Sequence, residues 1–127
     1  MKIDHTVVTD KPVEEAVARV STKAAELGFR VLHVHDFAAT LVEKGFSCEP
    51  LKVVEICNAK YASQVLNKDV KISLMLPCPI SVYIRDGRTH ISTMLPSLLS
   101  QFYPEAGIES LAQEVEKTVI RIIEESR

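Results

Sequence analysis

Hydrophobic residues recur at helical spacing near each end of the chain. One stripe runs from Val13 to Leu27 and predicts an amphipathic helix that stops at Gly28. We expect Asp10 to cap this helix and Pro12 to occupy its first turn. A second stripe predicts a helix of about five turns toward the C-terminal end. Its apolar members are Ile108, Leu111, Ala112, Val115, Val119, Ile122 and Ile123.

Shorter apolar runs before and between these two helices predict strands. Runs rich in β-branched residues, some of them alternating with polar residues, predict strands over residues 2–9, 29–36, 51–57, 70–76, 80–84 and 89–94. Two short helices are also predicted, one from Phe37 to Gly45 and one over 59–66 with Asn58 as its cap. Apolar residues over 96–103 indicate a further short helical region.

The clearest local signal is a β-hairpin around Asp86-Gly87. This dipeptide suits a two-residue turn because both turn positions need a positive φ angle. The resulting register has four facing pairs: Val82 with Ile91, Ile84 with Thr89, Tyr83 with His90, and Arg85 with Arg88.

The order of the predicted elements indicates the fold class. It reads strand, helix, strand, small helix, strand, small helix, three strands and a long helix. Because the strands cluster instead of alternating strictly with long helices, we predict an α+β fold with a largely antiparallel sheet and two long helices packed on one face. No repeat or linker interrupts the pattern, so residues 1–127 are expected to form a single domain.

Composition excludes several classes of protein. The chain has 127 residues, is 46% hydrophobic and carries a net charge of −2, which is ordinary for a globular domain. It has no basic stretch, no apolar run long enough to span a membrane and no apolar N-terminal signal segment. We therefore expect a cytoplasmic protein that binds neither nucleic acid nor membranes.

The residues best suited to react or to bind a ligand are the three cysteines, Cys48, Cys57 and Cys78. An odd number without a secretory signal favours reduced thiols over a disulfide framework. No two of them form a CxxC pair, so any meeting between Cys57 and Cys78 depends on the fold.

Three stretches of the chain resemble a known family. They are residues 28–32 (GFRVL), residues 56–59 (ICNA), and residues 72–78 (ISLMLPC) running into 80–83 (ISVY). Their order and spacing are similar to those of domain of unknown function 302, and the likeness covers nearly the whole chain. The resemblance implies a TATA-binding-protein-like β-α-β(4)-α arrangement and a bacterial or archaeal homodimer. It implies no accepted activity.

The two cysteines in these motifs are the leading candidates for a site. Cys57 and Cys78 are each predicted at a strand end, and Cys57 directly precedes a helix start, whose partial positive charge would lower the thiol pKa. Pro77 and Pro79 would stiffen the chain around Cys78. The predicted ligand-binding residues are Cys57, Asn58, Cys78, Tyr83 and His90. The alternative is that these cysteines are core residues, since free cysteine is commonly buried.

Two further groups of residues have weaker chemical interpretations. His33 and His35 lie two apart on a predicted strand and would share a face, which makes a metal half-site or simply two surface histidines. Arg85 and Arg88 would face each other beside the turn and suit an anion, or be solvated at a loop tip. No complete ligand set is present, so the sequence assigns no metal and leaves any cofactor unknown.

Three functional hypotheses remain. The first is a small ligand-binding or thiol-based carrier of sulfur or metal, built around Cys57 and Cys78. The alternative is a homodimeric interaction protein in which the cysteines only pack. The least favoured is an enzyme in which Cys57 is the nucleophile and His90 or His35 the base. No GxSxG, glycine-rich phosphate loop or HExxH motif supports an enzyme.

Overall fold

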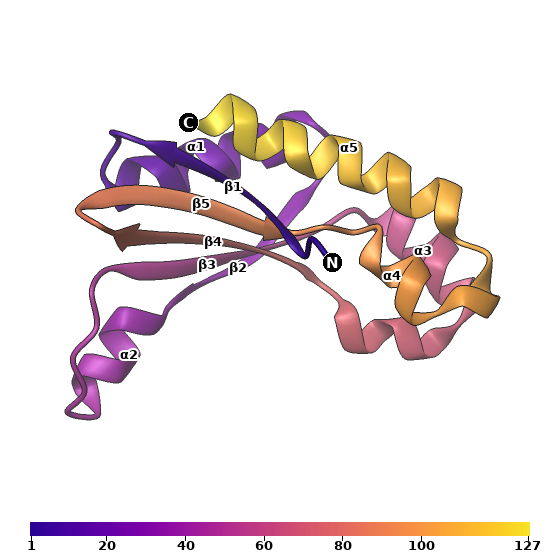
Figure 1. The fold of residues 1–127 in the computed structure, drawn as a ribbon, viewed down its shortest axis with the longest axis horizontal. Coiled ribbons are helices and arrows are strands. Elements are labelled where there is room, and N and C mark those ends of the chain that lie inside the picture. The colour runs from indigo at the N-terminus through magenta and orange to yellow at the C-terminus, as the bar shows by residue number, and fades with distance from the viewer.

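A five-stranded antiparallel sheet forms the centre of the molecule (Figure 1). The computed structural model describes residues 1–127. The strands are β1 (Asp4–Thr9), β2 (Arg30–Asp36), β3 (Leu51–Cys57), β4 (Cys78–Arg85) and β5 (Arg88–Met94). They are ordered β1-β5-β4-β3-β2, so the first strand of the chain lies beside the last.

The two long helices lie together on one side of this sheet, whereas shorter helices lie at its ends (Figure 1). The helices are α1 (Val13–Glu26), α2 (Phe37–Glu43), α3 (Ala59–Lys68), α4 (Leu98–Phe102) and α5 (Glu109–Ser126). Two 3₁₀ helices, η1 (Val70–Met75) and η2 (Pro104–Ala106), connect them. This arrangement confirms the predicted α+β fold, its antiparallel sheet and its two long helices on one face.

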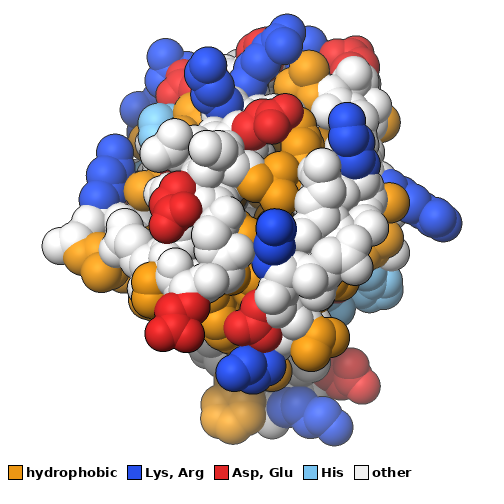
Figure 2. Space-filling model, turned by 90° about the vertical axis from the view of Figure 1, so that its right-hand side faces the viewer, with side chains coloured by type: hydrophobic (Ala, Val, Ile, Leu, Met, Phe, Trp, Pro, Cys, Tyr) orange, Lys and Arg blue, Asp and Glu red, His pale blue; other side chains and the backbone are white.

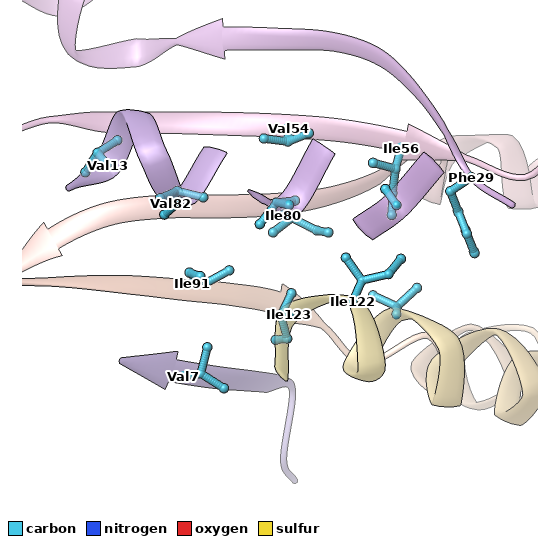
Figure 3. Close-up of a cluster of buried hydrophobic side chains, with 14 of the residues drawn as sticks. Val7, Val13, Phe29, Val54, Ile56, Ile80, Val82, Ile91, Ile122 and Ile123 are labelled. Atoms are coloured by element: carbon cyan, nitrogen blue, oxygen red, sulfur yellow. The ribbon is translucent and has the colours of Figure 1, made fainter. Parts of the chain in front are cut away.

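The main core fills the space between the sheet and helices α1 and α5 (Figure 3). Alternation along β1, β3, β4 and β5 produces it, because every second side chain in these strands points to the helices. Val54 and Ile56 of β3, for example, are both fully buried. They meet residues from the apolar stripe of α5, which is the face that this amphipathic helix buries.

The predicted hairpin is present between β4 and β5. All four predicted facing pairs are observed, from Val82–Ile91 to Arg85–Arg88. Asp86 and Gly87 have φ angles of 52° and 74°, as a two-residue turn with two left-handed positions requires. Local turn chemistry therefore set the register of the central strands.

The prediction of a strand over residues 70–76 was wrong. Residues Val70–Met75 form the 3₁₀ helix η1, which begins where the Asp69 side chain accepts a hydrogen bond from the Lys71 N–H at 2.9 Å. Of the apolar residues that would share one strand face, Ile72 is fully buried whereas Leu74 is 78% exposed. The sheet consequently has five strands and not the six that were predicted.

Asp10 does not cap helix α1, contrary to prediction. Pro12 occupies the cap position, and no side chain accepts a hydrogen bond from the first turn. Asp10 lies too early in the chain for that role and instead accepts a hydrogen bond from Arg88 at 2.9 Å. This exposed ion pair joins the β4–β5 hairpin to the connection between β1 and α1.

A second, smaller hydrophobic cluster lies at the end of the molecule occupied by α3, η1 and α4. It consists of the buried residues Val65, Ile72, Leu99 and Ile108, and we call it the smaller cluster. Figure 2 shows this end, where hydrophobic side chains reach the surface among charged and neutral ones. The fold therefore holds two apolar clusters with a boundary between them.

Helix α2 differs from the other helices because it has no buried residue. It extends away from α1 and α5 (Figure 1) and leaves Phe37, Val42 and, just beyond it, Phe46 exposed. None of the helices is both long enough and apolar enough to cross a lipid bilayer.

Candidate functional site

The fold places Cys57 and Cys78 at neighbouring strand ends. Cys57 is the last residue of β3 and Cys78 the first residue of β4, as predicted for strand ends. The two strands pair so that Ile56 lies opposite Cys78, and both of these side chains leave the sheet on the face of the main core. Cys57 is the next residue after Ile56, so its side chain leaves the sheet on the opposite face.

Both cysteines line one small cavity at the boundary between the main core and the smaller cluster. The cavity encloses about 30 Å³, which exceeds the roughly 10–15 Å³ needed for one water molecule. Its walls are almost entirely apolar. The lining residues are Phe29, Ile56, Cys57, Asn58, Tyr61, Ala62, Val65, Leu76, Cys78, Pro96, Leu99, Ala112 and Val115.

Asn58 fixes the chain immediately after Cys57. Its side-chain oxygen accepts a hydrogen bond from the Tyr61 N–H at 3.1 Å, so it caps α3 as predicted. Its side-chain amide donates to the carbonyl oxygen of Gly28 at 2.9 Å. Because these two hydrogen bonds hold both ends of the Asn58 amide, this residue positions the cavity wall.

Tyr61 holds the other polar group near the cavity. Its ring lies 6.3 Å from the ring of Phe29, measured between centroids, and packs against the main core. Its hydroxyl donates to the Glu114 carboxylate at 3.0 Å and so links α3 to α5. This hydrogen bond raises the pKa of the Tyr61 hydroxyl, because it stabilises the protonated form.

The expected lowering of the Cys57 pKa was wrong. Burial raises the pKa of the Cys57 thiol above its ordinary value of 9.0. Burial also raises the pKa of Cys78 to about 11, with a smaller contribution from negative charge on Cys57. Loss of hydration outweighs the partial positive charge of the α3 N-terminus. At neutral pH both thiols are therefore protonated and weakly nucleophilic.

Tyr83 and His90 lie elsewhere, on the sheet face that the long helices leave uncovered. Their rings are stacked, with centroids 5.5 Å apart. The Tyr83 hydroxyl is hydrogen bonded to the Ser92 hydroxyl at 2.8 Å, and Ser92 to Thr6 at 2.7 Å. Neither Tyr83 nor His90 lines the cysteine cavity.

The two strand histidines also lie away from the cavity. His33 and His35 are neighbours with ring centroids 4.4 Å apart, and His35 is paired with Glu55 at 2.8 Å. The structure contains no group of three or more His, Cys, Asp or Glu side chains arranged to hold a metal ion. Thiolates therefore do not complete a tetrahedral site around these histidines.

The remaining candidates are separate from one another. Cys48 lies in the loop before β3, and its thiol contacts the carbonyl oxygen of Glu49. Arg85 and Arg88 face each other as predicted, and Arg88 is paired with Asp10. The cavity is thus the place where predicted site residues come together, and those residues are Cys57, Asn58 and Cys78.

Sequence reasoning missed most of the apolar residues that build the cavity. Val65 and Leu99 belong to predicted helical segments, yet nothing local shows that they approach the same place as Cys78. The pair of rings from Phe29 and Tyr61 follows from the contact between the start of β2 and α3. The one local signal is at Tyr61, because its position three residues after the capping residue Asn58 places it in the first turn of α3.

Comparisons with known proteins identify one matching family model and a similar solved structure. The family model described as "Domain of unknown function DUF302" matches residues 5–126. A crystal structure of an uncharacterized conserved DUF302 protein from Bacillus stearothermophilus is similar over 100% of both chains, with 26% sequence identity and a TM-score of 0.94. A search of curated proteins gave no match.

Proposed function

The chain belongs to the DUF302 family, and we propose that it is a ligand-binding or carrier module that holds a small soft ligand between Cys57 and Cys78. The observation that carries the proposal is that both cysteines line one apolar cavity. If the two cysteines served only to pack the core, we would expect this space to be filled, because protein cores leave few voids.

The chemistry of the cavity limits what it accepts. A volume of about 30 Å³ admits one or two heavy atoms and not a cofactor-sized molecule. The Asn58 amide is held by two hydrogen bonds within the protein, and the cavity thiols are uncharged at neutral pH. Such a site favours a polarisable atom that bonds to sulfur, either a sulfane sulfur atom or a thiol-binding metal ion.

Native mass spectrometry tests this proposal directly. The protein is purified without metal or strong reductant and then exposed to inorganic polysulfide. A cysteine thiolate takes the terminal sulfur, forming one S–S bond while another breaks, and a polysulfide one sulfur shorter leaves. We expect a mass gain of one sulfur atom, or an equivalent extra mass already present in the purified protein.

Matched variants locate the site. Cys57→Ser and Cys78→Ser should each reduce the mass gain, whereas Cys48→Ser should leave it unchanged because Cys48 lies outside the cavity. Loading that follows Cys48, or that persists in a Cys57→Ser, Cys78→Ser double variant, would refute the proposal.

A second candidate function, homodimeric association, rests on a different observation. The sheet face carrying Ser81, Tyr83 and Ser92 has no helix over it, and α2 beside it buries none of its residues. A seven-residue helix is too short to be stable without packing, so a second copy covering this side would stabilise it.

The mass in dilute solution tests association. Light scattering should give twice the chain mass of 14.1 kDa. Ser81→Lys places a charge at the centre of the uncovered face and should shift the dimer toward monomer. Gln113→Lys, on the exposed side of α5, introduces the same charge and should not. A single-chain mass for the unaltered protein would exclude this candidate.

A further inference from the structure

A β-bulge in β2 determines which of its side chains share a face. The pairing of β2 with β3 shifts by one residue at Leu32, which has no facing residue of its own. Residues three apart in a regular strand point to opposite faces. Across this bulge Arg30 and His33 point to the same face instead, and their facing residues on β3 are Cys57 and Glu55. Bulges beside functional sites re-aim side chains in this way.

The face that these side chains share is the one that the long helices leave uncovered. Ile56 is fully buried in the main core, so Cys57, the next residue of β3, points away from the long helices. Cys57 is only partly buried, and Arg30 and His33 are exposed. Because β2 is an edge strand, no further strand lies beyond them. A dissolved ligand therefore has access to Cys57 from this side.

Two side chains with free N–H donors lie beside Cys57 on this face. Facing residues of an antiparallel pair have Cβ atoms about 5 Å apart and diagonal neighbours about 7–8 Å, within the reach of long side chains. No ion pair engages Arg30 or His33. The carboxylate of Glu55 is already paired with His35 at 2.8 Å. This part of the face is therefore suited to an anion.

Cys78 has no comparable surroundings. Its side chain packs against the main core, and burial raises the pKa of its thiol to about 11. Its facing residue on β3 is the fully buried Ile56. Of the two cysteines in the proposed carrier site, Cys57 is thus the one that a charged molecule can approach from solvent.

We propose that Arg30 and His33 bind an anionic sulfur donor, an inorganic polysulfide, on the uncovered face and that Cys57 accepts its terminal sulfur. This inference rests on the proposed function and names its donor and its accepting residue. The Cys57 thiol and a polysulfide dianion give a persulfide anion on Cys57 and a hydrogen polysulfide anion one sulfur shorter. One S–S bond forms, another breaks, and the thiol proton leaves with the shorter polysulfide.

Alkylation by a charged and by a neutral reagent tests the anion site without a sulfur donor. Iodoacetate carries a negative charge that iodoacetamide lacks, and both form a thioether with Cys57. Peptide mass analysis of timed samples in low-salt buffer gives both rates. Arg30→Gln should lower the iodoacetate rate about fivefold, the effect of one charge a few ångströms away in water, and change the iodoacetamide rate by less than about twofold.

Further variants test the part played by each donor. Arg30→Lys should keep the preference for iodoacetate, because the charge remains, and concentrated salt should remove it. His33→Ala should lower the iodoacetate rate by a smaller factor than Arg30→Gln, since imidazole has fewer donors than guanidinium. Arg85→Gln is the matched control, because Arg85 lies on the same face beside the β4–β5 turn and faces Arg88 instead of Cys57. It should leave both rates unchanged.

The outcomes separate this inference from the proposed function. A ratio of iodoacetate to iodoacetamide rates that is the same in wild type and Arg30→Gln refutes the anion site. Polysulfide is then offered to both proteins, and Arg30→Gln should slow the gain of sulfur at Cys57. If both gain sulfur equally fast, the donor-binding role is refuted and the carrier function stands. If wild type gains no sulfur at its cysteines, the carrier function and the polysulfide assignment fail together. Circular dichroism of each variant checks folding.

Discussion

The side-chain amide of Asn58 donates to the carbonyl oxygen of Gly28 at 2.9 Å, across 30 positions of sequence. The same side chain caps α3 through the Tyr61 N–H. Asn58 therefore connects the turn after α1 to the start of α3 through hydrogen bonds, and Cys57 is the residue directly before it. The position of Cys57 thus depends on the two hydrogen bonds made by Asn58.

Replacing Asn58 by alanine should lower the free energy of unfolding by about 1–2 kcal/mol, because a helix cap and a long-range hydrogen bond are lost together. Asn58→Asp should lower it by less, since a carboxylate still accepts the Tyr61 N–H but cannot donate to Gly28. Urea unfolding measures both changes. Asn67→Ala, at an exposed position of the same helix, is the control and should not destabilise the protein.

The thiols should differ in their rates of alkylation. With its pKa raised to about 11 from 9.0, Cys78 carries about 100-fold less thiolate at neutral pH than an unperturbed thiol. Iodoacetamide should therefore modify Cys48 first and Cys78 last, and the Cys78 rate should climb steadily up to about pH 11. Peptide mass analysis of timed samples gives each rate. Equal rates at Cys48 and Cys78 would contradict this description of the cavity.

The raised pKa of Cys78 should also make stability fall in alkaline solution. The unfolded chain loses this proton near pH 9.0 and the folded chain near 11, so between these values the unfolded state holds fewer protons. The contribution is complete below pH 9 and declines as pH rises through 11, by at most about 2–3 kcal/mol. Guanidinium unfolding at several pH values measures the decline.

Cys78→Ala is the comparison for that experiment. Tyrosine and lysine residues also titrate in this range, so only the difference between the two proteins reports on Cys78. The decline should be smaller in the variant, and parallel curves would contradict the prediction.

Two neighbouring positions of η1 should respond unequally to truncation. Ile72→Ala should cost about 2–5 kcal/mol, because Ile72 is fully buried in the smaller cluster. Leu74→Ala should cost less than about 0.5 kcal/mol, because Leu74 is 78% exposed. Urea unfolding of both variants checks the pair. Similar losses at both positions would indicate one shared buried face, as in a strand.

That pair also shows where sequence reasoning succeeded and where it failed. The turn at Asp86-Gly87 and the cap at Asn58 were predictable because short-range chemistry determines them. Over residues 70–76 the alternation of apolar and polar residues suggested a strand. Ile72 is instead buried by contacts with α4 and the start of α5. These contacts join distant parts of the chain, so the local sequence pattern does not predict them.

The candidate site was half predictable for the same reason. Cys57 and Cys78 were recognisable as chemically distinctive residues at strand ends, and both positions are confirmed. That both residues line one cavity depends on the pairing of β3 with β4, which joins distant parts of the chain. Their raised pKa values follow from burial that only the assembled clusters produce.

The boundary between the main core and the smaller cluster has a consequence for the order in which the native protein opens. The smaller cluster has 4 buried residues and the main core 15, so α3, η1 and α4 should form a separate cooperative unit that exchanges its amide hydrogens sooner. A ligand in the cavity between the two clusters would contact both units and would stabilise the less stable unit against local unfolding. Slower hydrogen exchange across α3 and α4 would then report occupancy of the cavity, whatever the identity of the occupant.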